Sequence, residues 1–232
     1  MPNTLPKTNT YKTFKEKLEI GNKKSIVNFK LQAGVNSYEE MEKIVELEPV
    51  AFKIFMDLES DESLEKIFND LGKLKTKTDY NGLVCVHAEN QAIVLDESEK
   101  LKSSENPIDY SYGRPAIAED VSVKQAIDLG YRNHLSLNIC HLSTIQSLEM
   151  ARSSKNYMAI STEFTPHHLL LNNNAYDTYG TLVKTNPPLR EEKSSVNIKH
   201  IDENSIIGTE HAPHTIEEKT KGTWESSPGI PN

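Results

Sequence analysis

The residues best suited to catalysis or metal binding follow a short apolar run near the carboxyl end of the chain. Ile206 belongs to that run, which reads as a buried strand that ends at Gly208. Glu210, His211 and His214 come within six residues of the strand end. Burying one carboxylate and two imidazoles at the end of a strand costs free energy unless they have polar or metal partners. Sites in α/β proteins lie at such strand ends, although a loop with solvated histidines would give the same local pattern.

Two more histidines stand in equivalent places. His87 and His141 each come directly after an apolar, strand-like run. A single histidine after a strand is more often structural than a ligand. Two of them, with a carboxylate after a third strand, favour a shared site. Because neutral imidazole and carboxylate suit zinc, we predict that His87, His141 and Glu210 bind zinc or a similar divalent ion.

Lys53 lies inside another apolar run, between Phe52 and Ile54. A charged amine would be expensive to bury there. In one interpretation the side chain reaches the rim of the fold and keeps its charge in water. In the other, the neutral amine has added CO2 and become a carbamate that ligates the metal. The residues alone leave both interpretations open.

Strand-like runs alternate with amphipathic helical segments, which is typical of a parallel sheet. Ser37 with Glu40, for example, forms a capping box that predicts a helix start, whereas residues 98–113 are polar and predict a loop over a site. Most of the runs carry a polar residue late in the strand or just beyond it. Only a closed or nearly closed barrel brings so many strand ends to one place. The six runs lie at residues 25–31, 50–56, 82–86, 135–140, 157–160, which begins a strand that leads into Glu163, and 206–207.

The composition argues against several classes of protein. A net charge of −8 without a basic patch argues against binding to nucleic acid. No apolar run approaches the roughly 18 residues of a membrane span, and the amino-terminal residues lack the apolar core of a signal peptide. Cys85 and Cys140 lie in apolar runs and fit buried thiols of a reducing compartment. We therefore predict a cytoplasmic protein.

Eight short motifs occur in the order seen in dihydroorotases, and the chain resembles the type I or archaeal-like branch of that family in the amidohydrolase superfamily. Each motif is weak alone, but eight in order are specific, and together they extend over residues 1–232. The motifs are Met1-Pro-Asn-Thr4, Phe52-Lys-Ile-Phe55, His87-Ala-Glu-Asn90, Arg114-Pro with Glu119, Cys140-His-Leu-Ser143, Thr165-Pro-His-His-Leu169, Asn186-Pro-Pro-Leu-Arg190 and His211-Ala-Pro-His214.

The resemblance implies an α/β fold, a TIM (β/α)8 barrel of the metal-dependent hydrolase type. In that family a strand with an HxH pair precedes the Met-Pro-Asn segment, and a further region follows the barrel. The chain has neither, so we expect residues 1–232 to form a single partial barrel domain that holds strands 3–8. Either the chain is a fragment of a longer protein, or a partner chain supplies the remainder.

The resemblance also implies a metal site with two zinc ions in the family. By position, Lys53 resembles the carbamylated lysine that bridges the metals, and His87 and His141 resemble the histidines on the second metal. Glu210 stands where the family has an aspartate that binds metal and moves a proton. Since the HxH pair would bind the first metal, one of the two sites is expected to be incomplete.

The implied reaction is the reversible hydrolysis of the cyclic amide of dihydroorotate to N-carbamoyl-aspartate, in pyrimidine biosynthesis. Asn3, Asn186 and His214 match residues that bind the carboxylate and ring of this small-molecule substrate, and Glu210 would move the proton. Two departures, the absent HxH pair and the glutamate at position 210, make activity of this chain alone an open question.

Two other functions remain open. The first is a related cyclic amidase such as an allantoinase or a dihydropyrimidinase, although the motifs around Asn3 and Asn186 favour dihydroorotate. The second is a non-catalytic homologue that acts as a partner of aspartate carbamoyltransferase, which the absent HxH pair favours. Either a homodimer or such a complex is compatible with the sequence.

Overall fold

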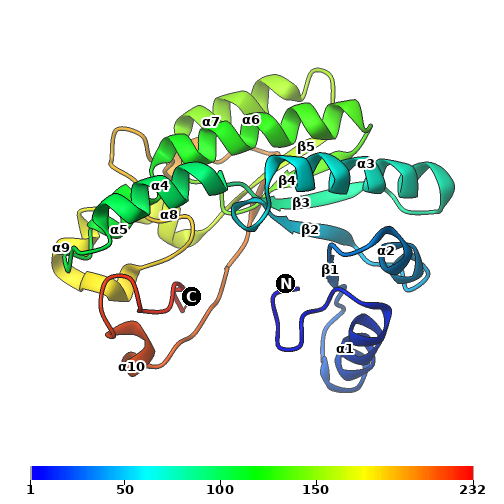
Figure 1. Cartoon of the computed structure of the whole chain (residues 1–232), viewed down its shortest axis with the longest axis horizontal. Helices are drawn as coiled ribbons and strands as arrows, with labels where there is room; N and C mark the ends of the chain where they lie inside the picture. The colour runs from blue at the N-terminus through cyan, green and yellow to red at the C-terminus, as the bar shows by residue number, and fades with distance from the viewer. Residues whose placement is uncertain (1, 232) are drawn as a thin grey trace.

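A computed structural model describes residues 2–231, so Met1 of the first motif lies outside the described residues. At its centre is a parallel sheet in which each strand pairs with the next strand along the chain, in the order β1-β2-β3-β4-β5-β6 (Figure 1). The strands are β1 (Gln32–Gly34), β2 (Ala51–Phe55), β3 (Leu83–His87), β4 (Ser136–Ile139), β5 (Ile160–Phe164) and β6 (Ser205–Ile207).

Helices connect the strands and cover one face of the sheet. In Figure 1, α3, α6 and α7 lie along the same side of the sheet, whereas α1 and α2 lie beside β1. The α-helices are α1 (Tyr11–Lys24), α2 (Tyr38–Val45), α3 (Asp61–Lys77), α4 (Gln91–Leu101), α5 (Asp109–Gly113), α6 (Ala116–Arg132), α7 (Ile145–Ser154), α8 (Pro166–Leu170), α9 (Ala175–Tyr179) and α10 (Ile216–Lys219). The 3-10 helices are η1 (Met56–Leu58), η2 (Gly180–Val183) and η3 (Ile198–His200). Among residues 2–231, no helix is both long and apolar enough to cross a membrane.

Capping side chains fix where the helices begin. Ser60, Asn90 and Thr144 each accept a hydrogen bond from a backbone N–H group in the first turn of α3, α4 and α7. Such caps satisfy donors that a helix start leaves unpaired. Ser37 caps α2 as predicted. The Glu40 side chain accepts instead from the backbone of Tyr11, so the predicted capping box is only half present.

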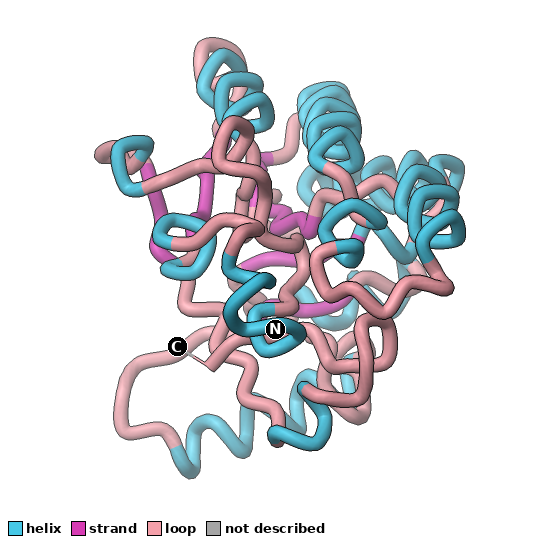
Figure 2. The backbone as a smooth tube through the Cα atoms, turned by 90° about the vertical axis from the view of Figure 1, so that its left-hand side faces the viewer, coloured by secondary structure: helices cyan, strands magenta, loops and turns pink. Residues whose placement is uncertain are grey.

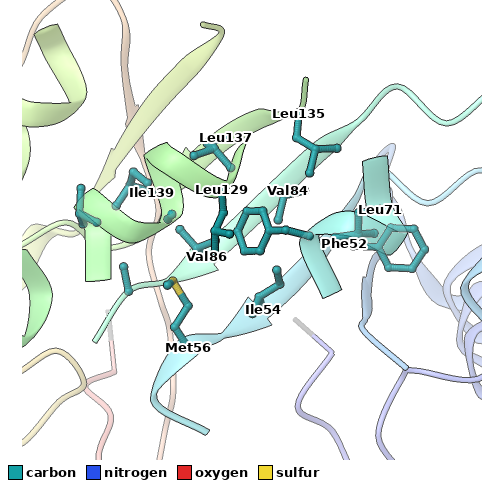
Figure 3. Packing of buried hydrophobic residues seen from close by; sticks show 14 of the residues in the cluster. Phe52, Ile54, Met56, Leu71, Val84, Val86, Leu129, Leu135, Leu137 and Ile139 are labelled. Atoms are coloured by element: carbon teal, nitrogen blue, oxygen red, sulfur yellow. The ribbon is translucent and has the colours of Figure 1, made fainter. Parts of the chain in front are cut away.

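The outer face of the sheet packs against the helices and forms the main core. Figure 3 shows apolar side chains of β2, β3 and β4 meeting those of α3 and α6. The buried side chains of this core include Phe52, Ile54, Phe68, Leu71, Val84, Val86, Leu129, Leu137 and Ile139. Successive side chains of a strand point to opposite faces, so the residues between these positions must face the other way.

The inner face of the sheet is polar. Lys53 is paired in register with Cys85, and Cys85 with Asn138, so the three side chains lie in a row across β2, β3 and β4. On β5, Glu163 accepts a hydrogen bond from Asn138 at 3.2 Å. Ala51, Cys85 and Cys140 form the small apolar cluster of this face. The sequence alternation therefore separates an apolar helix-covered face from a polar inner face.

The predicted fold class is confirmed: the sheet is parallel, strands alternate with helices, and six strands form part of a barrel. Three details of the prediction were wrong. The first strand is Gln32–Gly34 and not 25–31, where the chain forms no strand, and the fifth, Ile160–Phe164, begins at Ile160 and not at Tyr157. Residues 98–113 are not all loop, because α4 extends to Leu101 and α5 spans Asp109–Gly113.

The sixth strand forms as predicted but is not buried. Ile206 is 44% exposed and Ile207 is 53% exposed. The cause is the position of β6 at an edge of the sheet, where β5 is its only strand neighbour among residues 2–231. An apolar run thus marked a strand correctly, but it did not show whether the strand was central or at an edge.

The carboxyl-terminal segment is held by a buried lysine. Lys219, at the end of α10, donates hydrogen bonds of 2.8–3.0 Å to the backbone carbonyls of Lys184, Ser227 and Gly229. A single ammonium group with three donors can satisfy three carbonyls. Lys219 thereby ties the segment around Gly229 to the loop that follows η2.

The polar inner face predicts a pH-dependent stability. Burial raises the pKa of Glu163 from 4.5 to about 7. Because the carboxyl group then ionises at lower pH in the unfolded chain than in the folded one, the free energy of unfolding should fall as the pH rises from about 4.5 to about 7. Glu163→Gln should reduce this fall, measured by urea denaturation across that pH range. In the control Glu62→Gln, an exposed position on α3, the fall should match that of the parent protein; an unchanged fall in Glu163→Gln would contradict the assignment.

Candidate active site

A cavity of about 310 Å³ opens at the carboxyl ends of the strands. Five of the residues that the sequence predicted for a site line it, although they come from widely separated segments. These residues are Asn3, His87, His141, Asn186 and Glu210. The fold therefore brings together most of the predicted site, and Lys53 and His214 have to be placed separately.

His87 ends β3, and His141 follows β4 by two residues with a left-handed backbone, φ 38°. Nδ1 of His87 lies 3.1 Å from Nε2 of His141, and both rings are buried. Two nitrogens on one zinc, each at about 2.0–2.1 Å, lie about 3.3 Å apart in tetrahedral geometry. Burial, together with the charges of His87 and Lys53, holds the pKa of His141 well below 6.5, so this ring is neutral. The two rings thus converge as two ligands of one cation would.

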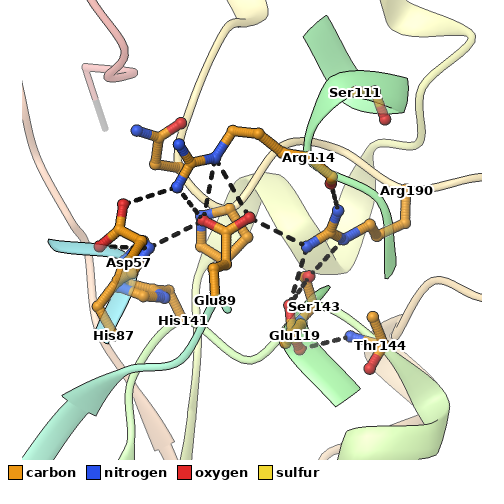
Figure 4. A network of polar contacts seen from close by, with 12 residues as sticks. Asp57, His87, Glu89, Ser111, Arg114, Glu119, His141, Ser143, Thr144 and Arg190 are labelled. Carbon is orange, nitrogen blue, oxygen red and sulfur yellow. Dashed lines mark hydrogen bonds and ion pairs between the residues drawn. The ribbon is translucent and has the colours of Figure 1, made fainter. Parts of the chain in front are cut away.

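The other nitrogen of His87 faces an acidic side chain that the sequence analysis noted only as part of a motif. Nε2 of His87 lies 2.8 Å from Oε2 of Glu89, which is fully buried (Figure 4). Arg114 Nη2 lies 2.6 Å from the same oxygen. Burial opposes the ionised form of Glu89, but Arg114, His87 and Arg190 outweigh it and hold its pKa below 4.5. Glu89 is therefore a carboxylate behind the ring of His87.

Asp57, in η1, is a second acidic residue that the sequence analysis missed. Its Oδ2 accepts a hydrogen bond from Arg114 at 2.8 Å, and its Oδ1 lies 3.7 Å from Nε2 of His87. That Oδ1 is buried and makes no hydrogen bond within residues 2–231. The ligand atoms of Asp57, His87 and Glu89 all lie within 4.8 Å of one another, which would also suit a metal ion. The only sequence signal was a charged residue four positions after Lys53, beyond the end of the strand.

The structure excludes one of the two interpretations of Lys53, the one in which the side chain reaches the rim. Its side chain is 1% exposed on the inner face of β2, so it does not reach the rim into water. Its Nζ lies 5.3 Å from the ring centre of Phe55 and makes no hydrogen bond within the described residues. Burial acts to lower the pKa of Lys53, whereas Cys140 and Glu210 act to raise it, with a net rise. The addition of CO2 to this buried amine stays a prediction.

Glu210 follows β6 with a left-handed backbone, φ 45°, and its side chain lines the cavity. Its charge contributes to the raised pKa of Lys53, which places the carboxylate and the amine in one electrostatic environment. Two imidazoles and a carboxylate line this cavity, and the Lys53 amine lines a neighbouring one that shares Asn3 and Phe55 with it. Imidazole nitrogen and carboxylate oxygen are ligands that suit zinc. The residues present therefore fit the metal that the sequence predicted.

The predicted substrate-binding residues are placed differently from one another. Asn3 and Asn186 line the cavity, and Asn186 Oδ1 accepts a hydrogen bond of 2.6 Å from Tyr110. His214 is not among the lining residues; its Nδ1 lies 3.4 Å from Glu218 Oε2. It lies next to Gly229, which does line the cavity, since a Cβ at that glycine would be 3.1 Å from the His214 ring.

Sequence comparison identifies relatives over the whole chain, although no family model matches it. The chain is 41% identical over 232 residues to a dihydroorotase of Methanothermobacter thermautotrophicus. This alignment covers 100% of the chain and 52% of that protein. It is 42% identical over 235 residues to a dihydroorotase of Methanosphaera stadtmanae, with 100% and 53% covered. The chain thus spans about half the length of these curated relatives.

Solved structures support the fold independently. An L-hydantoinase (dihydropyrimidinase) from Arthrobacter aurescens superimposes with a TM-score of 0.86 at 24% sequence identity, over 99% of this chain and 54% of that one. A dihydropyrimidinase from Brevibacillus agri gives a TM-score of 0.79 at 22% identity, over 96% and 52%. The whole of this chain is thus related to dihydroorotases, of which it covers about half, and it shares its fold with these hydantoinases.

Proposed function

We propose that the protein to which this chain belongs is a zinc-dependent dihydroorotase, which interconverts dihydroorotate and N-carbamoyl-aspartate in pyrimidine biosynthesis. The observation that carries the proposal is the convergence of His87, His141 and Glu210 on one cavity, in a chain 41% identical to a dihydroorotase. Residues 1–232 would form part of a single barrel domain of that enzyme. The cytoplasm stays the predicted compartment, on sequence grounds alone.

In this proposal zinc is held by His87 Nδ1, His141 Nε2, the Glu210 carboxylate and Lys53. When bound, zinc polarises an amide carbonyl and lowers the pKa of a coordinated water. The neutral state of His141 supports the assignment, because a protonated imidazole has no lone pair to offer a metal. The burial of the Lys53 side chain away from water supports it too. Addition of CO2 to the amine, with loss of one N–H proton, would give a carbamate whose oxygens are ligands.

The remaining steps fall to side chains of the chain itself. Glu210 would accept the proton of the attacking water and return it to the ring nitrogen as the amide bond breaks. Asn3 and Asn186 would donate hydrogen bonds to the substrate carboxylate and ring from the cavity wall. Tyr110 fixes the amide of Asn186 by donating to its Oδ1, which leaves the Asn186 NH2 group to act as donor. His214, which lies next to Gly229, is also proposed to bind the substrate.

A substrate panel tests the proposed reaction against the related cyclic amidases. Dihydroorotate, dihydrouracil, hydantoin and allantoin are offered to the zinc-loaded protein, and ring opening is measured for each. We expect ring opening of dihydroorotate to be the fastest, because the asparagines at the cavity provide polar contacts for its carboxylate, which dihydrouracil lacks. Faster opening of an uncharged ring would favour a dihydropyrimidinase. No opening of any ring, with zinc bound, would favour a non-catalytic partner of aspartate carbamoyltransferase.

The ligand assignment predicts the metal content. The purified chain should contain about one zinc ion, and the double variant His87→Ala/His141→Ala should retain under about a tenth of it, because two of the few ligands are lost. Mass spectrometry of the desalted proteins measures both. His134→Asn serves as control, since His134 is exposed with φ 55° and asparagine tolerates that backbone. Equal zinc in the double variant and the control would refute the assignment.

The glutamate at position 210 predicts a gain of function. Its extra methylene displaces the carboxylate by about 1 Å relative to aspartate, beyond the roughly 0.5 Å that a catalytic arrangement tolerates. Glu210→Asp should therefore raise the rate of dihydroorotate hydrolysis, by up to about a hundredfold, and aspartate also tolerates the left-handed backbone at this position. The rate is compared with that of Glu210→Gln, which should be inactive. A lower rate in Glu210→Asp than in the parent would show that the backbone already compensates for the longer side chain.

A further inference from the structure

Behind His87 lies a group of buried charges that the proposed reaction does not use. Glu89, Arg114, Glu119 and Arg190 are at most 9% exposed, and their contacts link β3, α6 and the loop after η2 (Figure 4). Buried ion pairs are weak contributors to stability, because desolvation offsets much of their attraction. A group of this size beside a candidate metal ligand therefore calls for a reason other than stability.

The contacts of Glu89 fix it from several sides. Arg114 donates to it through Nε at 3.2 and 3.3 Å and through Nη2 at 2.6 Å. Arg190 Nη2 adds a longer ion pair, at 3.7 Å. Arg114 Nη2 also donates to Asp57 Oδ2 at 2.8 Å, so the Arg114 side chain cannot rotate away from Glu89 without breaking a second ion pair. Two guanidinium groups around one carboxylate keep it ionised, and an ionised carboxylate can only accept hydrogen bonds.

This constraint determines which nitrogen of His87 carries the proton. Glu89 Oε2 lies 2.8 Å from His87 Nε2, a hydrogen bond in which the ring must be the donor. In a neutral ring the remaining nitrogen, Nδ1, then has the lone pair. Nδ1 is the atom that points at His141 Nε2, 3.1 Å away. The carboxylate thus selects the tautomer with its lone pair directed to the candidate metal position.

We propose that Glu89, clamped by Arg114, is a positioning residue that holds His87 as the Nε2–H tautomer and turns its Nδ1 lone pair toward the metal. The inference rests on the proposed zinc site and adds the residue that prepares one of its ligands. A carboxylate that accepts from the far nitrogen of a ligating histidine typically changes metal affinity by about 10–100-fold.

Glu119 provides a matched control. It is equally buried and is paired with Arg190 at 3.2 Å, but its other bonds go to the backbone of Ser143 and Thr144 and to the Ser143 hydroxyl. None of these hydrogen bonds involves His87. Glu89→Gln and Glu119→Gln therefore replace two buried carboxyl groups of the same network, and they differ in whether a histidine ring is affected.

The first measurement is the tautomer of His87 in the metal-free parent chain, from 15N chemical shifts of its ring. We expect a proton on Nε2. In Glu89→Gln the ring loses its ionised acceptor, so the preference for a proton on Nε2 should weaken and the Nδ1–H tautomer should become populated. Glu119→Gln should leave the proton on Nε2. A parent ring with its proton on Nδ1 would overturn the proposal even if both variants failed to fold.

The second measurement is zinc affinity by competition with a chromophoric chelator. Glu89→Gln should bind zinc about 10–100-fold more weakly than the parent, whereas Glu119→Gln should stay within about threefold even if it is less stable. Equal losses in both variants would reduce Glu89 to a structural ion-pair partner and overturn the proposal. A parent chain that binds no zinc but shows the Nε2–H tautomer, lost in Glu89→Gln alone, would refute the proposed metal site and still support the positioning of His87 by Glu89.

Discussion

The register of a parallel sheet is the constraint on which the site depends. Neighbouring strands place Lys53, Cys85 and Asn138 in one row on the inner face, and the same register brings the strand ends together above that row. His87 and His141 meet at 3.1 Å because β3 and β4 end at the same level. The outer residues of the same strands fill the helix-covered core, so the packing that stabilises the sheet also holds the ligands in place.

The sheet has two edges, and this affects how the site is supported. Among residues 2–231, β1 and β6 have one strand neighbour each. Lys53 lies on β2, next to one edge, and Glu210 follows β6 at the other. The candidate ligands at the centre, on β3 and after β4, are buried at 4% exposure, whereas β6 is largely exposed. The central imidazoles and Lys53, which is 1% exposed, are thus the best supported part of the site, whereas Glu210 follows the exposed edge strand.

Much of this arrangement could be predicted from the sequence, because it follows from short-range patterns. Strand-like runs with polar residues at their ends gave the parallel sheet and the positions of His87 and His141. The exposure of Ile206 could not be predicted, because an apolar run is the same at an edge and at the centre. The roles of Asp57 and Arg114 were missed for another reason: their partners lie 57 residues apart in the chain, and no periodicity links them.

The difference between two buried glutamates shows what the fold adds to the motifs. Glu119 stands in the network with Ser143 and Arg190 and satisfies backbone groups at the start of the loop after β4. Glu89 also pairs with Arg114 and Arg190, but its Oε2 accepts a hydrogen bond from the ring of His87. If the network only held the loops together, both carboxylates could bind backbone donors, as Glu119 does. That one of them faces His87 instead is the reason to regard this half of the network as part of the site and the other half as its support.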